Sequence, residues 1–150
     1  MTDALDDLRL FREWRSEFRP EPDAHAYLSQ HLDISSAVIF ARLLAPELVL
    51  VRGCVILKDA YDPENFERWW QTVNGDTVRL EAVLNHLHLW DVFEPDGEED
   101  ERALESLANL VARSWDLHAS RVRPDRTFRV EVMDDYGPTI VMTSSPKDLA

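Results

Sequence analysis

The chain has 150 residues, of which 45% are apolar, with five Trp and six Phe; this supports one domain with a substantial core and argues against disorder of the whole. Its formal net charge of −13 argues against DNA, RNA or an anionic membrane as a partner, because each would meet like charge. We therefore expect partners that are neutral or basic.

The negative charge is concentrated in one region of the chain. Residues 61–101 contain twelve acidic residues and two arginines, a net charge of −10, whereas residues 102–150 sum to zero. This regional acidity is the strongest functional indication in the sequence.

The lone cysteine and the N-terminus indicate where the protein resides. Cys54 cannot form an internal disulfide, and in its apolar run we expect a buried, unreactive thiol. The sequence begins Met1-Thr2-Asp3 rather than with a basic segment, and no stretch approaches the roughly 18 apolar residues of a membrane span. We expect a cytoplasmic protein with no membrane partner.

The first third of the chain shows three helical patterns. Apolar residues at helical spacing predict an amphipathic helix over residues 3–18, ended by Pro20 and Pro22. Two shorter helices are predicted over residues 23–31 and 34–45, with Asp23 and Asp33 as N-caps. Four arginines alternate with the apolar residues of the first helix and its end, and their acidic neighbours favour internal or intersubunit salt bridges over a basic ridge: Arg9, Arg12, Arg15 and Arg19.

Residues 48–57 are almost continuously apolar apart from Arg52-Gly53. This pattern fits one buried strand with a bulge at Gly53, or a tight hairpin that turns there. We favour a single long strand at the centre of the sheet.

Two further helices are predicted after this strand. Asp62 as N-cap with Pro63 at the first helical position begins one that ends at Asn74-Gly75. Its Trp69-Trp70 pair is interpreted as core packing rather than as a platform for a sugar. The next helix is predicted over residues 76–93, and its apolar residues cover most of its circumference, which predicts burial.

In the C-terminal part, the spacing of the apolar residues changes from that of a helix to the alternation typical of a strand. Residues 99–119 carry an apolar stripe and predict a helix, whereas Phe128, Val130 and Val132 alternate with polar residues. A turn sequence at residues 134–138 completes a β-hairpin. The fold class is therefore α+β: a helix-rich single domain over residues 1–150, with a small antiparallel sheet of about three strands.

A narrow polar stripe on the predicted 76–93 helix is the first candidate site. Glu81, Asn85 and His88 fall on one face of this otherwise apolar helix. Such a stripe forms an internal hydrogen-bond network, reaches solvent through a gap, or lines a pocket. In a pocket, Glu81 would act as base or acceptor, His88 as its proton partner and Asn85 as the group that orients a ligand.

Metal and catalytic motifs are weak in this sequence. On a helix His86 and His88 would point about 160° apart, so they would chelate an ion together only from a strand. There is no cysteine pair, no nucleophile elbow and no glycine-rich phosphate loop. We expect no metal site and no cofactor, and because no catalytic motif is found the sequence leans against an enzyme without deciding the question.

The segment 94–101 is the second candidate site, with six acids in eight residues: Glu94, Asp96, Glu98, Glu99, Asp100 and Glu101. It can be a solvated loop whose acids interact favourably with the positive N-terminal end of the next helix, or a docking surface for a basic protein partner. A calcium loop is disfavoured because the ligand spacing does not match.

The sequence favours a non-enzymatic interaction protein that docks a partner of basic or mixed charge: an inhibitor or immunity-type protein, an adaptor or a regulator. The alternative is a small-molecule-binding protein or modest enzyme whose pocket is lined by Glu81, Asn85 and His88. The sequence also allows a homodimer.

Overall fold

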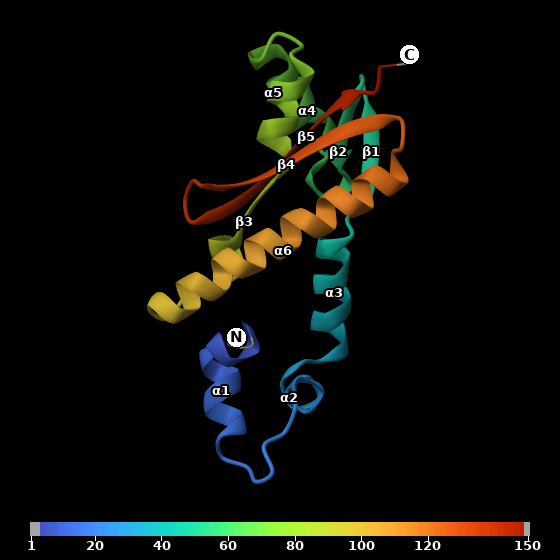
Figure 1. The fold of residues 1–150 in the computed structure, drawn as a ribbon. Coiled ribbons are helices and arrows are strands. Elements are labelled where there is room, and N and C mark those ends of the chain that lie inside the picture. The colour runs from blue at the N-terminus through green and yellow to red at the C-terminus, as the bar shows by residue number, and fades with distance from the viewer. Residues whose placement is uncertain (1–3, 149–150) are drawn as a thin grey trace.

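The computed structural model describes residues 4–148, which form several helices and two small antiparallel sheets (Figure 1). The elements in chain order are η1 (Ala4–Asp7), α1 (Arg9–Arg15), α2 (Ala24–His31), α3 (Ile34–Leu44), β1 (Leu48–Val51), β2 (Cys54–Leu57), η2 (Lys58–Ala60), α4 (Pro63–Thr72), α5 (Thr77–Leu84), β3 (His86–His88), η3 (Leu89–Asp91), α6 (Glu98–Val122), β4 (Arg126–Asp134) and β5 (Pro138–Pro146).

The larger sheet has three antiparallel strands in the order β3-β5-β4. Ile140 on the central strand pairs with Leu87 on one side and with Val132 on the other. The predicted α+β class, with a sheet of about three strands and a C-terminal hairpin, is confirmed. The hairpin spans β4 and β5, so each strand is longer than the alternating pattern indicated.

Helix α6 lies across one face of this sheet, and α5 and α4 lie on the other side of β5 (Figure 1). The main core forms between α6 and the sheet, where Trp115 and Val111 pack with Ile140 and Met142. A second core joins the β1–β2 hairpin to α4 and α5, through residues that include Cys54, Ile56, Phe66, Val73, Leu80 and Leu84. Trp69 and Trp70 pack against this second core, which agrees with their interpretation as packing residues.

Residues 48–57 form a hairpin, so the prediction of one long central strand is wrong. β1 and β2 pair antiparallel as a separate two-stranded sheet, with Val51 opposite Cys54. Arg52 and Gly53 both adopt positive φ, 48° and 80°, the conformation that two-residue hairpin turns require. All four residues of β2 are apolar and buried. The hairpin therefore lacks the alternation of apolar and polar residues that would separate two strands in the sequence.

The predicted 76–93 helix is also wrong beyond its first half. Helix α5 ends at Leu84, and the chain continues as the short strand β3 and the 3-10 turn η3. The change occurs at Asn85, whose carbonyl accepts from Met142 N of β5 at 3.0 Å instead of continuing the helix. Short apolar runs suit a buried strand and a buried helix equally, so the sequence pattern alone did not separate them.

The other helices match the sequence patterns more closely. The predicted 3–18 helix is divided into η1 and α1, and its first residue, Asp3, lies outside the described residues with Met1 and Thr2. The Asp23 and Asp33 caps are confirmed by their hydrogen bonds to Ala26 N and Ser36 N.

The acidic segment 94–101 is only partly a loop. Its last four residues form the first turn of α6, which begins at Glu98 rather than at residue 99. No helix within residues 4–148 is long and apolar enough to cross a membrane.

Candidate functional site

Glu81 is buried, and both oxygens of its carboxylate accept hydrogen bonds from within the chain. Oε1 accepts from Val55 N at 3.0 Å and from the Ser144 hydroxyl at 2.8 Å, while Oε2 accepts from Ser144 N. Val55 belongs to β2 and Ser144 to β5, so one side chain of α5 joins the two sheets.

Asn85 extends the same contact one helical turn further. Its Oδ1 accepts from Leu57 N at 2.9 Å, and its Nδ2 donates to the carbonyls of Val55 at 2.7 Å and Met142 at 3.3 Å. The side-chain amide therefore has partners for its acceptor and for both donors, and Asn85 is 0% exposed.

The arrangement of Glu81 and Asn85 is that of an internal hydrogen-bond network. Neither side chain lines the cavity beside His88, the cavity between α6 and the β4–β5 turn, or the cavity beside Trp115. Burial raises the pKa of Glu81, while hydrogen bonds from Val55 and Ser144 oppose that rise. A ligand would have to displace these internal partners, so ligand binding by this pair stays a prediction without geometric support.

His88 is not part of this network. It lies on β3, where its Nδ1 is 2.7 Å from the Thr139 hydroxyl, and it lines a separate cavity with His86. The structure thus brings Glu81 and Asn85 together and places His88 elsewhere, because the helix that would have aligned all three ends at Leu84.

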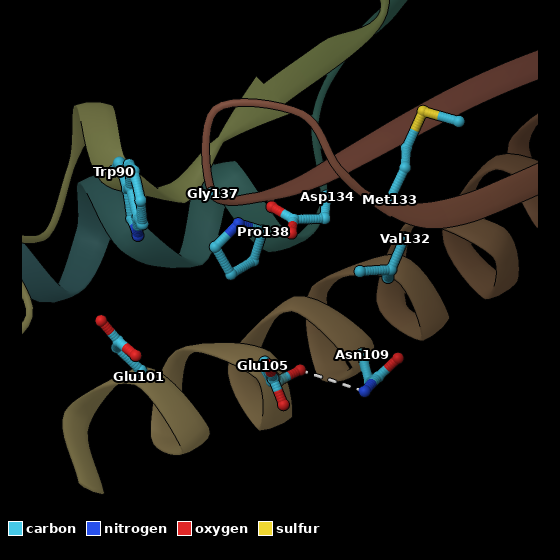
Figure 2. Close-up of a pocket in the computed structure, with 9 residues that line it drawn as sticks. All are labelled: Trp90, Glu101, Glu105, Asn109, Val132, Met133, Asp134, Gly137 and Pro138. Atoms are coloured by element: carbon cyan, nitrogen blue, oxygen red, sulfur yellow. Dashed lines mark hydrogen bonds between the residues drawn. The ribbon is translucent and has the colours of Figure 1, made fainter. Parts of the chain in front are cut away.

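A cavity of about 530 Å³ opens between the first half of α6 and the turn of the β4–β5 hairpin (Figure 2). We call it the acidic cleft. It is lined by Trp90, Glu101, Glu105, Asn109, Val132, Met133, Asp134, Gly137 and Pro138.

Helical spacing places the polar wall of the acidic cleft. Glu101, Glu105 and Asn109 are four residues apart and therefore share one face of α6. In Figure 2 the Glu101 carboxylate points toward the Trp90 ring, and Asp134 lies across the cleft from α6, next to Pro138. Three carboxylates thus surround one opening.

The opposite wall depends on Gly137. A Cβ at this position would lie only 2.4 Å from the Trp90 ring, so only glycine lets the hairpin turn approach the indole so closely. Gly137 also adopts a φ of 74°, which favours glycine. Trp90 packs edge-on against Tyr136, with ring centres 5.4 Å apart, and this holds the aromatic wall in place.

The three carboxylates of the acidic cleft carry uncompensated charge. Among residues 4–148, Glu101, Glu105 and Asp134 form no ion pair, and the hydrogen bond that Asn109 donates to Glu105 goes to the backbone carbonyl. They can therefore attract a cation without first losing an internal partner.

Three of the six acids predicted to dock a partner are paired with arginines of α1. Arg9 contacts Asp100 at 3.3 Å and Asp96 at 3.7 Å, and Arg12 contacts Glu99 at 2.9 Å. These contacts attach α1 to the start of α6, so the predicted salt bridges of the arginines are internal. The pKa of Asp100 is lowered by hydrogen bonding to Asp96 N and by Arg9.

The remaining acids of segment 94–101 differ in their surroundings. Glu98 lies 4.0 Å from Arg102 on the same helix, and Glu94 forms no ion pair within residues 4–148. Glu101 is the one member of the segment that lines the acidic cleft. The spacing of Glu101 and Glu105 on one helical face can be read from the sequence. The presence of Trp90 and Asp134 in the same cleft cannot, because it depends on the tertiary fold.

Comparison of the chain with protein-family models, with curated proteins and with solved structures gives no match. The chemistry of the acidic cleft is therefore interpreted from its own residues. Carboxylates beside an exposed indole suit a cationic group that pairs with the acids and packs on the ring.

The internal network gives a stability prediction. Glu81→Ala should lower the free energy of unfolding by about 3 kcal/mol or more, because three buried donors lose their acceptor at about 1–3 kcal/mol each. Urea denaturation measures this, with Glu17→Ala as the exposed control, expected to change it by less than about 0.5 kcal/mol. An unchanged unfolding midpoint for Glu81→Ala would contradict the structural role.

The raised pKa of Glu81 also predicts a pH dependence. The folded state binds this proton more tightly than the unfolded chain, whose Glu pKa is about 4.3, so the linked stability is complete below that pH. It is lost as the pH rises through the folded-state pKa. The difference in unfolding free energy between wild type and Glu81→Gln should therefore shift against the wild type as pH rises from about 4. A pH-independent difference would argue against the raised pKa.

Proposed function

We propose that this protein is a non-enzymatic interaction protein that docks a basic protein partner at the acidic cleft. Inhibitors, immunity-type proteins, adaptors and regulators belong to this class. The observation that carries the proposal is a set of three carboxylates around a cavity of about 530 Å³, none of which forms an ion pair within residues 4–148: Glu101, Glu105 and Asp134.

The walls of the acidic cleft favour a lysine or arginine side chain over a free inorganic cation. Trp90 is 42% exposed and offers a face to a cation and its aliphatic stem, and Val132, Met133 and Pro138 add apolar surface. The carboxylates at the rim would increase the association rate and select against acidic partners.

A cytoplasmic location is part of the same proposal. It is supported by Cys54, which is buried and is a free cysteine. Burial raises the pKa of its thiol to about 11, so the thiol stays protonated and unreactive near neutral pH. The net charge of −13 continues to favour a protein over a nucleic acid as the partner.

The test compares two double variants that remove the same charge from the same helix. Glu101→Gln with Glu105→Gln alters the acidic cleft, whereas Glu98→Gln with Glu99→Gln leaves it intact. Each protein is immobilised, proteins from the source lysate are captured, and the captured proteins are eluted with a salt gradient. The partner is defined as a protein that wild type and the 98/99 variant retain and the 101/105 variant loses.

Binding kinetics with that purified partner complete the test. At low salt the 101/105 variant should associate about tenfold more slowly, with a weaker salt dependence, and the 98/99 variant should differ less. Equal losses in the two variants would indicate general acidity rather than the acidic cleft. Retention of every captured protein by the 101/105 variant would overturn the proposal.

A further inference from the structure

His86 and His88 project from the same face of β3. They pair in register with Val141 and Thr139 of β5, whose neighbours Ile140 and Met142 face the core beneath α6. Because side chains alternate along a strand, the two imidazoles lie on the sheet face away from α6. There they line a cavity of about 500 Å³, together with residues of α5, β4 and β5.

The one hydrogen bond of the His86 ring within residues 4–148 determines which of its two nitrogens carries the proton in the neutral form. Its Nδ1 lies within hydrogen-bond distance of the Val83 carbonyl oxygen. A carbonyl can only accept, so Nδ1 carries the proton and donates it. The neutral ring therefore keeps the lone pair on Nε2.

His88 reaches the same tautomer through Thr139. The Thr139 hydroxyl donates its one proton to a backbone carbonyl, that of Asp135 at 2.7 Å or of Gly137 at 3.1 Å. Its oxygen must therefore accept from Nδ1 of His88, 2.7 Å away. In both histidines Nε2 is left as a free acceptor, with no hydrogen-bond partner within residues 4–148.

The two rings are spaced as in a shared metal site. Their centres lie 4.8 Å apart and their planes are inclined by 66°. Zinc binds imidazole nitrogen at about 2.0–2.1 Å, and two imidazoles bound at a tetrahedral angle then have ring centres roughly 5 Å apart. Metal-binding histidines also usually donate the other ring nitrogen to a carbonyl or similar acceptor, as both do here.

We propose that His86 and His88 chelate one divalent transition ion, such as Zn²⁺, through their Nε2 atoms. On a helix the two rings would point about 160° apart, whereas on the strand β3 they share one face. Imidazole ligands favour zinc, copper and nickel over magnesium and calcium, which prefer oxygen.

The protein would supply two ligands and leave the other positions open. Within residues 4–148 no group of three or more His, Cys, Asp or Glu side chains is placed to hold an ion. Of the acids that line the cavity, Glu131 is paired with Arg129 at 2.7 Å, whereas Asp135 has no ion pair in that range. Water or a group from a bound partner would complete the coordination.

Titration of the full chain with Zn²⁺, followed by calorimetry, tests this site. The expected result is a saturable event with one ion per chain, and Mg²⁺ should not reproduce it. His86→Ala should weaken Zn²⁺ binding by at least about tenfold, and Thr139→Val, which frees Nδ1 of His88, by about tenfold. His25→Ala, on exposed α2, is the matched control and should bind as wild type.

His86 decides the outcome because its side chain is exposed, whereas His88 is half-buried and its replacement affects packing. Nitrogen NMR of the histidine rings adds a direct readout: Zn²⁺ should shift the Nε2 signals of His86 and His88 and leave the His25 signals unchanged. Equal affinity of wild type and His86→Ala, or ring signals that do not move, would overturn the proposal. Binding restricted to the acidic segment would give both of these results.

Discussion

Glu81 of α5 and Asn85, which caps that helix, connect the two sheets through side-chain hydrogen bonds, and the packing of the sheets depends on them. Within residues 4–148 β2 pairs only with β1, and β5 continues past its pairing with β3 with no further strand on that side, while β4 pairs along its other side. Glu81 and Asn85 fill this gap by accepting from and donating to the backbone of both edges. Without them several buried backbone groups would lack partners, and each such loss is costly. The buried carboxylate is therefore structural in origin, although its surroundings resemble those of a reactive acid.

This contact also determines where the acidic cleft lies. It fixes β5 against α5, so the opposite face of the sheet is available to α6 and the hairpin turn meets the first half of that helix. A second link supports the same geometry, because Arg126 at the start of β4 donates to the Gly53 carbonyl in the β1–β2 turn. The acidic cleft thus lies between the long helix α6 and the β4–β5 hairpin, and contacts outside the cleft hold both elements in place.

Local chemistry made several elements predictable from sequence. The caps Asp33 and Asp62, the apolar stripe of α6 and the alternation in β4 each encode their own element, so these were placed within a few residues. The end of α5 at Leu84 was not, because it depends on a contact with Met142 of β5, which is distant in the chain. The turn at Gly53 is local, but a short apolar run fits one strand or a hairpin equally well. The acidic cleft shows the same division. Acidity of the region was visible, but which acids Arg9 and Arg12 neutralise, and which remain open beside Trp90, are consequences of tertiary contact.

The contact between Glu81 and Ser144 joins residues separated by 63 positions, and this affects the order in which the chain can fold. The β1–β2 hairpin, α4 and α5 form a local group and can assemble early, because their contacts are close in sequence. Without β5, that local group offers Glu81 only the donor from Val55. Burial of the fully hydrogen-bonded carboxyl group therefore requires β5, whose Ser144 supplies the other two donors.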